Sequence, residues 1–85
     1  MRKLTEQDIA AIVGTSCESF TIEQARVKGG QYSDSDHYGI ALGKSESGNY
    51  VTWWFHLEDE KPSFYWGHYF MENLEAAIQD YSTRE

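Results

Sequence analysis

The chain has 85 residues, with 14 acidic and 7 basic side chains, a formal net charge of −7 and an aromatic content of 15%. The length is that of one small domain, residues 1–85, and the acidic balance argues against direct binding of DNA or RNA, which needs a basic patch. Cys17 is the single cysteine, so no intrachain disulfide can form. The charged N-terminal segment and the lack of a long apolar run predict a cytoplasmic protein without a signal peptide or membrane contact.

A short helix is predicted close to the N-terminus. Thr5 is placed to cap it, with Asp8 three residues later where a capping box usually has Glu. Leu4 and Ile9 have the spacing of a hydrophobic staple across this cap. The apolar residues of the helix form one stripe, which predicts a face packed on a core: Ile9, Ile12 and Val13.

The next segment, residues 19–28, is interpreted as a strand. Thr21 with Gln24 also fits a helical capping box, but the β-branched pair Thr21 and Ile22 favours a strand. The alternation of apolar residues changes parity near Gln24, which predicts a β-bulge. A glycine pair follows, and residues 29–36 are predicted to form a polar loop.

Catalytic and metal-binding patterns are missing from the sequence. Residues 34–37 have a metal-like composition, but a calcium loop that starts at Asp34 requires Glu where Ser45 stands. The three histidines have no known ligand spacing, and no nucleophile motif or phosphate-binding glycine loop is present. We therefore expect a protein that is not an enzyme and that uses no metal and no cofactor.

Residues 38–70 are predicted to form three strands joined by two hairpin turns, and the rest of the fold is expected to pack on them. The central strand, residues 50–57, is rich in β-branched and aromatic residues and is bounded by polar turns at 45–49 and 58–63. This strand is apolar on both faces, and the sequence does not decide whether the two helices lie on one face of the sheet or on both.

The register of the first hairpin is predicted from hydrophobic matching. An even number of turn residues sets Leu42 opposite Trp53 and, two residues on, Ile40 opposite Phe55. An odd number would set both aliphatic residues on the face of Thr52, so we expect the even turn. The predicted core face consists of Val51, Trp53, Phe55 and Leu57 of the central strand with Phe64, Trp66, His68 and Phe70 of the third strand.

The opposite face of this sheet carries aromatic residues among small ones. Trp54 then lies between Ala41 and Gly67, whose small side chains leave room for its ring. Trp54 either covers Gly67 beneath a helix or belongs to a recognition surface. The residues of that aromatic face are Trp54, His56, Tyr65 and Tyr69.

A second helix is predicted at the C-terminus, over residues 71–82, from an amphipathic stripe: Phe70, Leu74, Ala77, Ile78 and Tyr81. We expect it to lie across the core face, over Val51, Trp53, Phe55, Phe64 and Trp66. The predicted fold class is therefore α+β: an antiparallel meander of three to four strands with a short N-terminal helix and a C-terminal helix packed on one face.

The acidic charge suggests a protein–protein interaction module that presents carboxylates to a basic partner surface, for instance as an inhibitor that occupies a nucleic-acid-binding surface. The candidate partner-binding acids are expected to form one acidic edge, with Tyr38 or Tyr65 nearby for short-range contact: Asp34, Asp36, Glu58, Asp59 and Glu60. Small acidic α+β chains of this kind often come from phages and mobile elements, a likeness of composition that assigns no residue a role.

The aromatic face suggests a second class of function, a small-ligand binding or sequestering protein in which Trp54 stacks on a flat or cationic ligand. It also suggests self-association. If both helices pack on the same face of the sheet, exposed Trp54, Tyr65 and Tyr69 would favour a homodimer through that face or through the edge strand.

Overall fold

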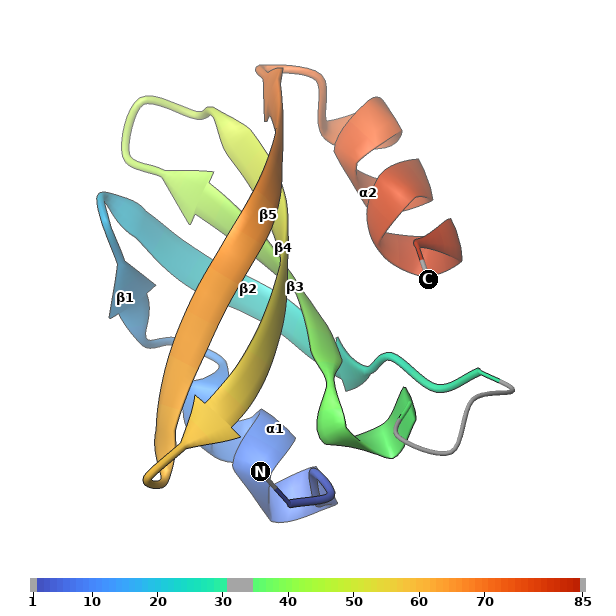
Figure 1. The fold of residues 1–85 in the computed structure, drawn as a ribbon. Helices are drawn as coiled ribbons and strands as arrows, with labels where there is room; N and C mark the ends of the chain where they lie inside the picture. The colour runs from blue at the N-terminus through green and yellow to red at the C-terminus, as the bar shows by residue number, and fades with distance from the viewer. Residues whose placement is uncertain (1, 31–34, 85) are drawn as a thin grey trace.

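The computed structural model describes residues 2–30 and 35–84. Its elements are α1 (Glu6–Ile12), β1 (Ser16–Cys17), β2 (Phe20–Val27), a 3-10 turn (Ser35–His37), β3 (Gly39–Ser45), β4 (Tyr50–Glu58), β5 (Lys61–Met71) and α2 (Leu74–Thr83). The strands form one antiparallel sheet in the order β1-β2-β3-β4-β5 (Figure 1). The predicted α+β meander is confirmed in class, with five strands instead of three to four, because two-residue β1 is too short to leave a sequence pattern.

The N-terminal third of the chain folds largely as expected. The Thr5 side chain accepts a hydrogen bond from the Asp8 backbone, and the Asp8 carboxylate accepts one from the Thr5 N–H, at 3.2 and 2.7 Å. Ile12 is buried, but Val13 caps the helix and is exposed, so the predicted stripe is one residue too long. Strand β2 is confirmed, and its register shifts between Ile22 and Gln24, at the predicted bulge.

The predicted register of the β3–β4 hairpin is wrong by one residue. Leu42 pairs with Thr52 and Ile40 with Trp54, instead of with Trp53 and Phe55. The turn is odd because the Gly48 N–H donates to the carbonyl of Ser45 and Gly48 has a φ of 87°, which together make a three-residue loop with a glycine bulge. Hydrophobic matching fails here because both faces of β4 are covered, so each parity buries apolar residues.

Side-chain size explains the observed register better than hydrophobicity does. A Cβ atom on Gly39 would lie 2.2 Å from Cζ of Phe55, and one on Gly67 would lie 2.9 Å from Nε1 of Trp53. Gly43 has a similar relation to Trp53, with 3.0 Å to Cζ3. The small residues of the sheet therefore make room for the rings of Trp53 and Phe55 and not, as predicted, for Trp54.

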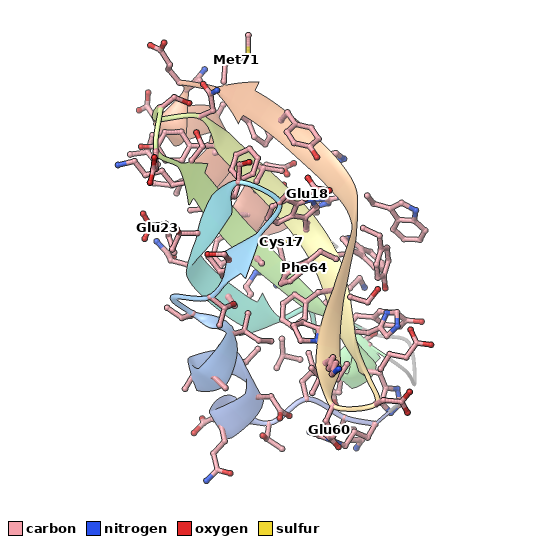
Figure 2. All side chains as sticks on the ribbon, turned by 90° about the vertical axis from the view of Figure 1, so that its left-hand side faces the viewer. Cys17, Glu18, Glu23, Glu60, Phe64 and Met71 are labelled. Carbon is pink, nitrogen blue, oxygen red and sulfur yellow. The ribbon has the colours of Figure 1, made fainter. Side chains whose placement is uncertain are left out.

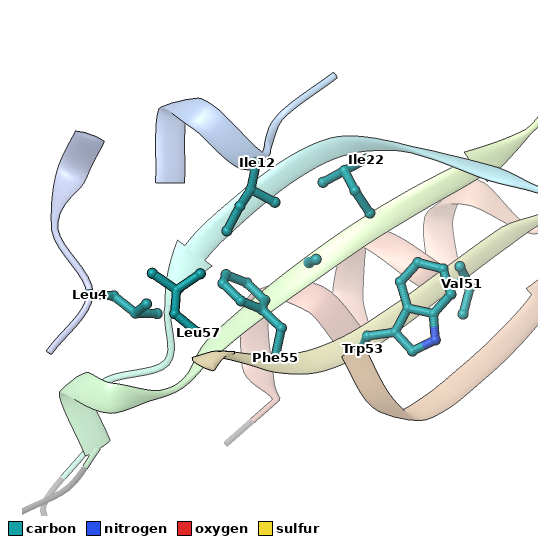
Figure 3. Close-up of a cluster of buried hydrophobic side chains, with 8 residues drawn as sticks. Leu4, Ile12, Ile22, Val51, Trp53, Phe55 and Leu57 are labelled. Carbon is teal, nitrogen blue, oxygen red and sulfur yellow. The ribbon is translucent and has the colours of Figure 1, made fainter. Parts of the chain in front are cut away.

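We call the side that carries these rings the inner face: Ala41, Val51, Trp53, Phe55 and Leu57. These side chains are buried with Leu4, Ile12 and Ile22, and α1 closes this core (Figure 3). Phe20 of β2 and Tyr69 of β5 have ring centroids 6.2 Å apart, although β3 and β4 lie between their strands. The sheet is therefore strongly curled, like half of a barrel, with the inner face inside.

We call the other side the outer face: Ile40, Leu42, Thr52, Trp54 and His56. Helix α2 packs here and not on the inner face as predicted, since Ala77 and Tyr81 form a second buried cluster with Ile40 and Leu42. The helix begins at Leu74, after the N-cap Asn73, because β5 continues to Met71. The two helices thus cover opposite faces, and the condition under which we expected self-association is not met.

Strand β5 is the long edge strand of the sheet, with Glu60 and Met71 near its two ends (Figure 2). Phe64 pairs with Phe55, and its side chain packs on the inner core as expected. Register shifts later in the strand reverse which side chains of its second half face inward. Tyr69 therefore lies on the inner side, and Trp66 is 64% exposed. The predicted core-face positions of Trp66, His68 and Phe70 are therefore wrong, since His68 is exposed and Phe70 packs in the outer cluster with α2.

Candidate functional site

Helix α2 covers only part of the outer face. Beyond its C-terminal end the sheet carries five ring-bearing side chains that contact one another, here called the aromatic cluster: Tyr38, Trp54, His56, Tyr65 and Trp66. Four of them are half-buried and Trp66 is exposed. The cluster is therefore an aromatic surface that remains open to solvent.

The rings of the aromatic cluster contact one another edge to face or at tilted angles. Trp66 lies 4.9 Å from Trp54 and 5.0 Å from Tyr65 between ring centroids, with interplanar angles of 61° and 83°. Tyr38 contacts Trp54 at 5.5 Å, and His56 lies 5.4 Å from Tyr65. Such contacts favour specific relative orientations of the rings and so shape this surface.

Trp66 reaches this surface because of a bulge in β5. The pairing of β4 with β5 shifts between Thr52 and Trp54, so that an extra residue of β5 is accommodated opposite Trp53. Trp66 has a φ of 56°, the left-handed region that bulky residues seldom adopt. Gly67 follows directly and leaves space for the Trp53 ring on the other face.

The end of α2 is fastened beside the aromatic cluster by polar contacts. Arg84 donates to the backbone oxygen of Thr52, at 3.0 Å, and to that of Trp66, which satisfies carbonyl groups next to the bulge. Asp80 accepts hydrogen bonds from the Thr52 hydroxyl at 2.5 Å and from His68 Nδ1 at 3.0 Å. Arg26 donates to the carbonyl of Tyr81, which caps the helix from β2.

These contacts change the acidity of Asp80. Partial burial alone would raise its pKa, but the hydrogen bonds from Thr52 and His68, with the nearby Arg84 charge, bring the pKa below its ordinary value. The carboxylate therefore stays ionised and holds α2 to β4 and β5.

The acidic residues predicted to bind a partner lie at the end of the sheet where β4 meets β5. Asp59 and Glu60 form a two-residue turn, with φ values of 51° and 65° that favour the right-handed twist of the hairpin. Asp36, in the 3-10 turn before β3, is exposed at the same end of the sheet. Asp34 lies outside the described residues.

Glu60 differs from its neighbours because Arg2 binds it. The Arg2 guanidinium donates to Glu60 at 3.1 and 2.5 Å and to Asp8 at 2.7 and 2.9 Å. These bonds lower the pKa of both carboxyl groups below the ordinary range. Glu58 and Asp59, in contrast, form no ion pair with a lysine or arginine among residues 2–30 and 35–84.

The two sets of candidate residues meet in one shallow depression of about 360 Å³, lined by Tyr38, His56, Leu57, Glu58, Asp59 and Tyr65. His56 Nδ1 lies 3.3 Å from the Tyr65 hydroxyl, and His56 Nε2 lies 3.7 Å from the Glu58 carboxylate. Burial, with a smaller contribution from Tyr38, raises the pKa of Tyr65 to about 12, so its hydroxyl is neutral at physiological pH. The depression thus combines aromatic walls with carboxylates at its rim.

The structure brings together three of the four residues of the predicted aromatic face: Trp54, His56 and Tyr65. It places Tyr69 on the inner side of β5, against Phe20, because the bulge reverses the parity of the strand. Sequence reasoning missed Trp66, which was expected on the core face and instead contacts Trp54 and Tyr65 on the outer face. The glycine after Trp66 was the available signal, since an isolated glycine within a strand often marks a bulge.

Among residues 2–30 and 35–84 no three His, Cys, Asp or Glu side chains gather as a metal site would require. Neither helix of that part of the chain has the length and apolar character needed to cross a bilayer. Comparisons with protein-family models, curated proteins and solved structures find no match to this chain. Its function is therefore inferred from the chemistry of the aromatic cluster and the acids beside it.

Proposed function

We propose that this protein is a small, non-enzymatic interaction module that binds a basic protein partner through the aromatic cluster and the neighbouring acids. The observation that carries the proposal is the conformation of Trp66, whose φ is 56° and whose surface is 64% exposed. A left-handed backbone costs a bulky residue roughly 1–2 kcal/mol, and an exposed indole returns little of that through burial. A residue kept at such a cost supports a role in recognition, where tryptophan is the most frequent energetic hot spot.

The charge distribution supports a basic partner. The three arginines of the described chain are used internally: Arg2 on Asp8 and Glu60, Arg26 on Tyr81, and Arg84 on Thr52 and Trp66. Glu58 and Asp59 keep their charges free of lysine and arginine within the same residues. Such exposed carboxylates accelerate encounter with a positive surface, and the rings supply short-range contact after it.

A basic surface large enough to select an acidic module is typical of nucleic-acid-binding proteins. The module would act as an inhibitor if it occupies that surface. DNA or RNA added in excess should then displace it from its partner, whereas a partner bound elsewhere would stay in place.

The test of the proposal is capture of a partner from an extract of cells that express the protein, with two variants in parallel. We expect a partner that binds the parent at about 0.1 M salt and is released at about 1 M, where the Debye length falls from roughly 10 to 3 Å. The double charge reversal Asp36→Lys with Glu58→Lys should abolish capture. The matched control reverses Glu46 and Glu72, which lie at the other end of the sheet, and should retain capture.

A partner that is captured equally by all variants at both salt concentrations would contradict the proposal. A small-ligand binding protein is the second candidate, and the depression beside the aromatic cluster favours it. In that case a small molecule should co-purify with the parent, detectable by mass spectrometry after denaturation, and Trp54→Ala should lose it while the charge reversal keeps it.

A further inference from the structure

The depression beside the aromatic cluster is lined by groups that are suited to bind a flat cation. Tyr38 and Tyr65 stand on either side of His56, with ring centroids 6.3 and 5.4 Å from it. The faces of aromatic rings carry partial negative charge and attract cations. Glu58 and Asp59, which also line the depression and are exposed, add two full negative charges.

The same surface already holds one cation of the chain itself. The Lys28 ammonium lies 4.9 Å from the ring centre of Trp54. Trp54 in turn contacts Tyr38 at 5.5 Å and Tyr65 at 6.5 Å, so the occupied ring adjoins the rings that line the depression. This contact is independent of the acids, and it shows that one ring of the aromatic cluster, next to the depression, accepts a cation.

The groups around the depression favour a guanidinium over an ammonium. Arginine is planar, weakly hydrated and presents paired N–H donors, so it can stack on a tyrosine ring while it bonds a carboxylate in a bidentate manner. Lysine offers a compact, strongly hydrated charge that gains less from flat walls. The Tyr65 hydroxyl remains neutral beside such a ligand because its pKa is about 12.

We propose that the depression lined by Tyr38, His56 and Tyr65 binds one arginine side chain of the partner, with its guanidinium stacked on the tyrosines and bonded to Glu58 and Asp59. This inference rests on the proposed function, because it names the group by which a basic partner is recognised. Trp66 extends the surface beside this depression and contacts the partner residues next to the arginine.

The experiment titrates the full chain with three blocked, otherwise neutral Gly/Ser peptides that contain a single arginine, lysine or citrulline, and follows the aromatic and imidazole signals by NMR. We expect the arginine peptide to shift the signals of His56 and Tyr65. The lysine peptide should bind roughly tenfold more weakly, which corresponds to about 1.4 kcal/mol, and citrulline should produce no shift. Glu58→Gln with Asp59→Asn should weaken binding of the arginine peptide by tenfold or more, since charge-assisted hydrogen bonds are stronger than neutral ones.

Asparagine tolerates the left-handed backbone of position 59, so this double variant keeps the turn. The matched control, Glu46→Gln with Glu72→Gln, removes the same charge at the far end of the sheet and should leave the arginine titration unchanged. Equal shifts with arginine and citrulline, or an equal loss in the control variant, would overturn the inference. If the two basic peptides bind equally well and the salt-sensitive partner is still captured, the arginine site is wrong while the proposed function stands.

Discussion

The two faces of the sheet use aromatic residues in opposite ways. On the inner face, Trp53 and Phe55 are set against glycines and closed off by α1, so that Trp53 is 3% exposed and Phe55 is fully buried. On the outer face α2 covers Ile40 and Leu42, and its C-terminal end borders the aromatic cluster at Trp54 and leaves Trp66 exposed. The inner face is therefore closed by the chain itself, whereas the outer face keeps an aromatic surface that is open to solvent.

Trp53 and Trp66 make this contrast concrete. Trp53 has extended backbone in β4 and packs against Phe20 and Phe64, with ring centroids 5.5 and 5.4 Å away. Trp66 has a left-handed backbone on the edge strand and lies mostly in solvent. Trp53 is thus a buried tryptophan that stabilises the core, whereas Trp66 is an exposed tryptophan on the surface of the fold.

The largest effect should come from emptying the inner face. Phe55→Ala, or Trp53→Ala, is expected to lower the free energy of unfolding by about 3–5 kcal/mol, because each removes a fully packed ring from a closed core. A domain of this size has a stability of roughly 5–15 kcal/mol, so the loss is severe. Denaturant titration followed by circular dichroism measures this loss. Variants that unfold at the same denaturant concentration as the parent would refute the assignment of this face.

A smaller but more specific effect is expected from filling the space under a ring. Gly39→Ala introduces a Cβ atom 2.2 Å from Cζ of Phe55, so the ring or the strand must move. Overpacking of this kind costs about 1–3 kcal/mol, and the second substitution Phe55→Leu should recover part of the loss. In the even register expected from the sequence, Gly39 would lie beside His56, and alanine there would be tolerated.

Much of the fold was accessible from the sequence, because local signals specify it. The capping box at Thr5, the bulge near Gln24 and the sheet meander each depend on neighbouring residues and each is confirmed. The hairpin register and the face chosen by α2 depend instead on how large rings and glycines fit together across strands. A strand that is apolar on both faces, like β4, gives no periodic signal from which to choose.

The candidate site was predicted in part for the same reason. The residues of β4 and the first half of β5, such as Trp54 and Tyr65, lie on the expected common face. The bulge at Trp66 reverses the side-chain alternation of β5. Trp66 therefore lies on the outer face and Tyr69 on the inner face, each opposite to the prediction. A single inserted residue, which no periodic pattern reveals, decides which aromatic side chains form the surface.

Acidification should loosen the outer face before the inner one. The pKa of Asp80 is lowered in the folded protein, so its contribution to stability is present above the unfolded value of about 3.9 and is lost as the pH falls through the folded value. We expect stability to decline below about pH 4, and the variant Asp80→Asn to show a smaller decline. Unfolding curves recorded between about pH 2 and 7 measure this, and an unchanged slope in the variant would contradict it.

The smallest effect on stability, and the sharpest test of the contrast, is expected from Trp66→Gly. Glycine relieves roughly 1–2 kcal/mol of left-handed strain, but it costs about 0.5–1 kcal/mol of backbone entropy and about 0.5–1.5 kcal/mol for the lost edge-to-face contacts. The net change in the free energy of unfolding should stay within about 1 kcal/mol, although the same change at Trp53 should unfold the protein.

Partner capture, in contrast, should be lost in Trp66→Gly, because the indole is the central apolar contact of the proposed surface. Equilibrium unfolding and partner capture, measured on one preparation of each variant, separate these outcomes. A loss of more than about 2 kcal/mol on Trp66→Gly would show that the indole stabilises the fold. The aromatic residues of both faces would then be structural and would differ only in burial.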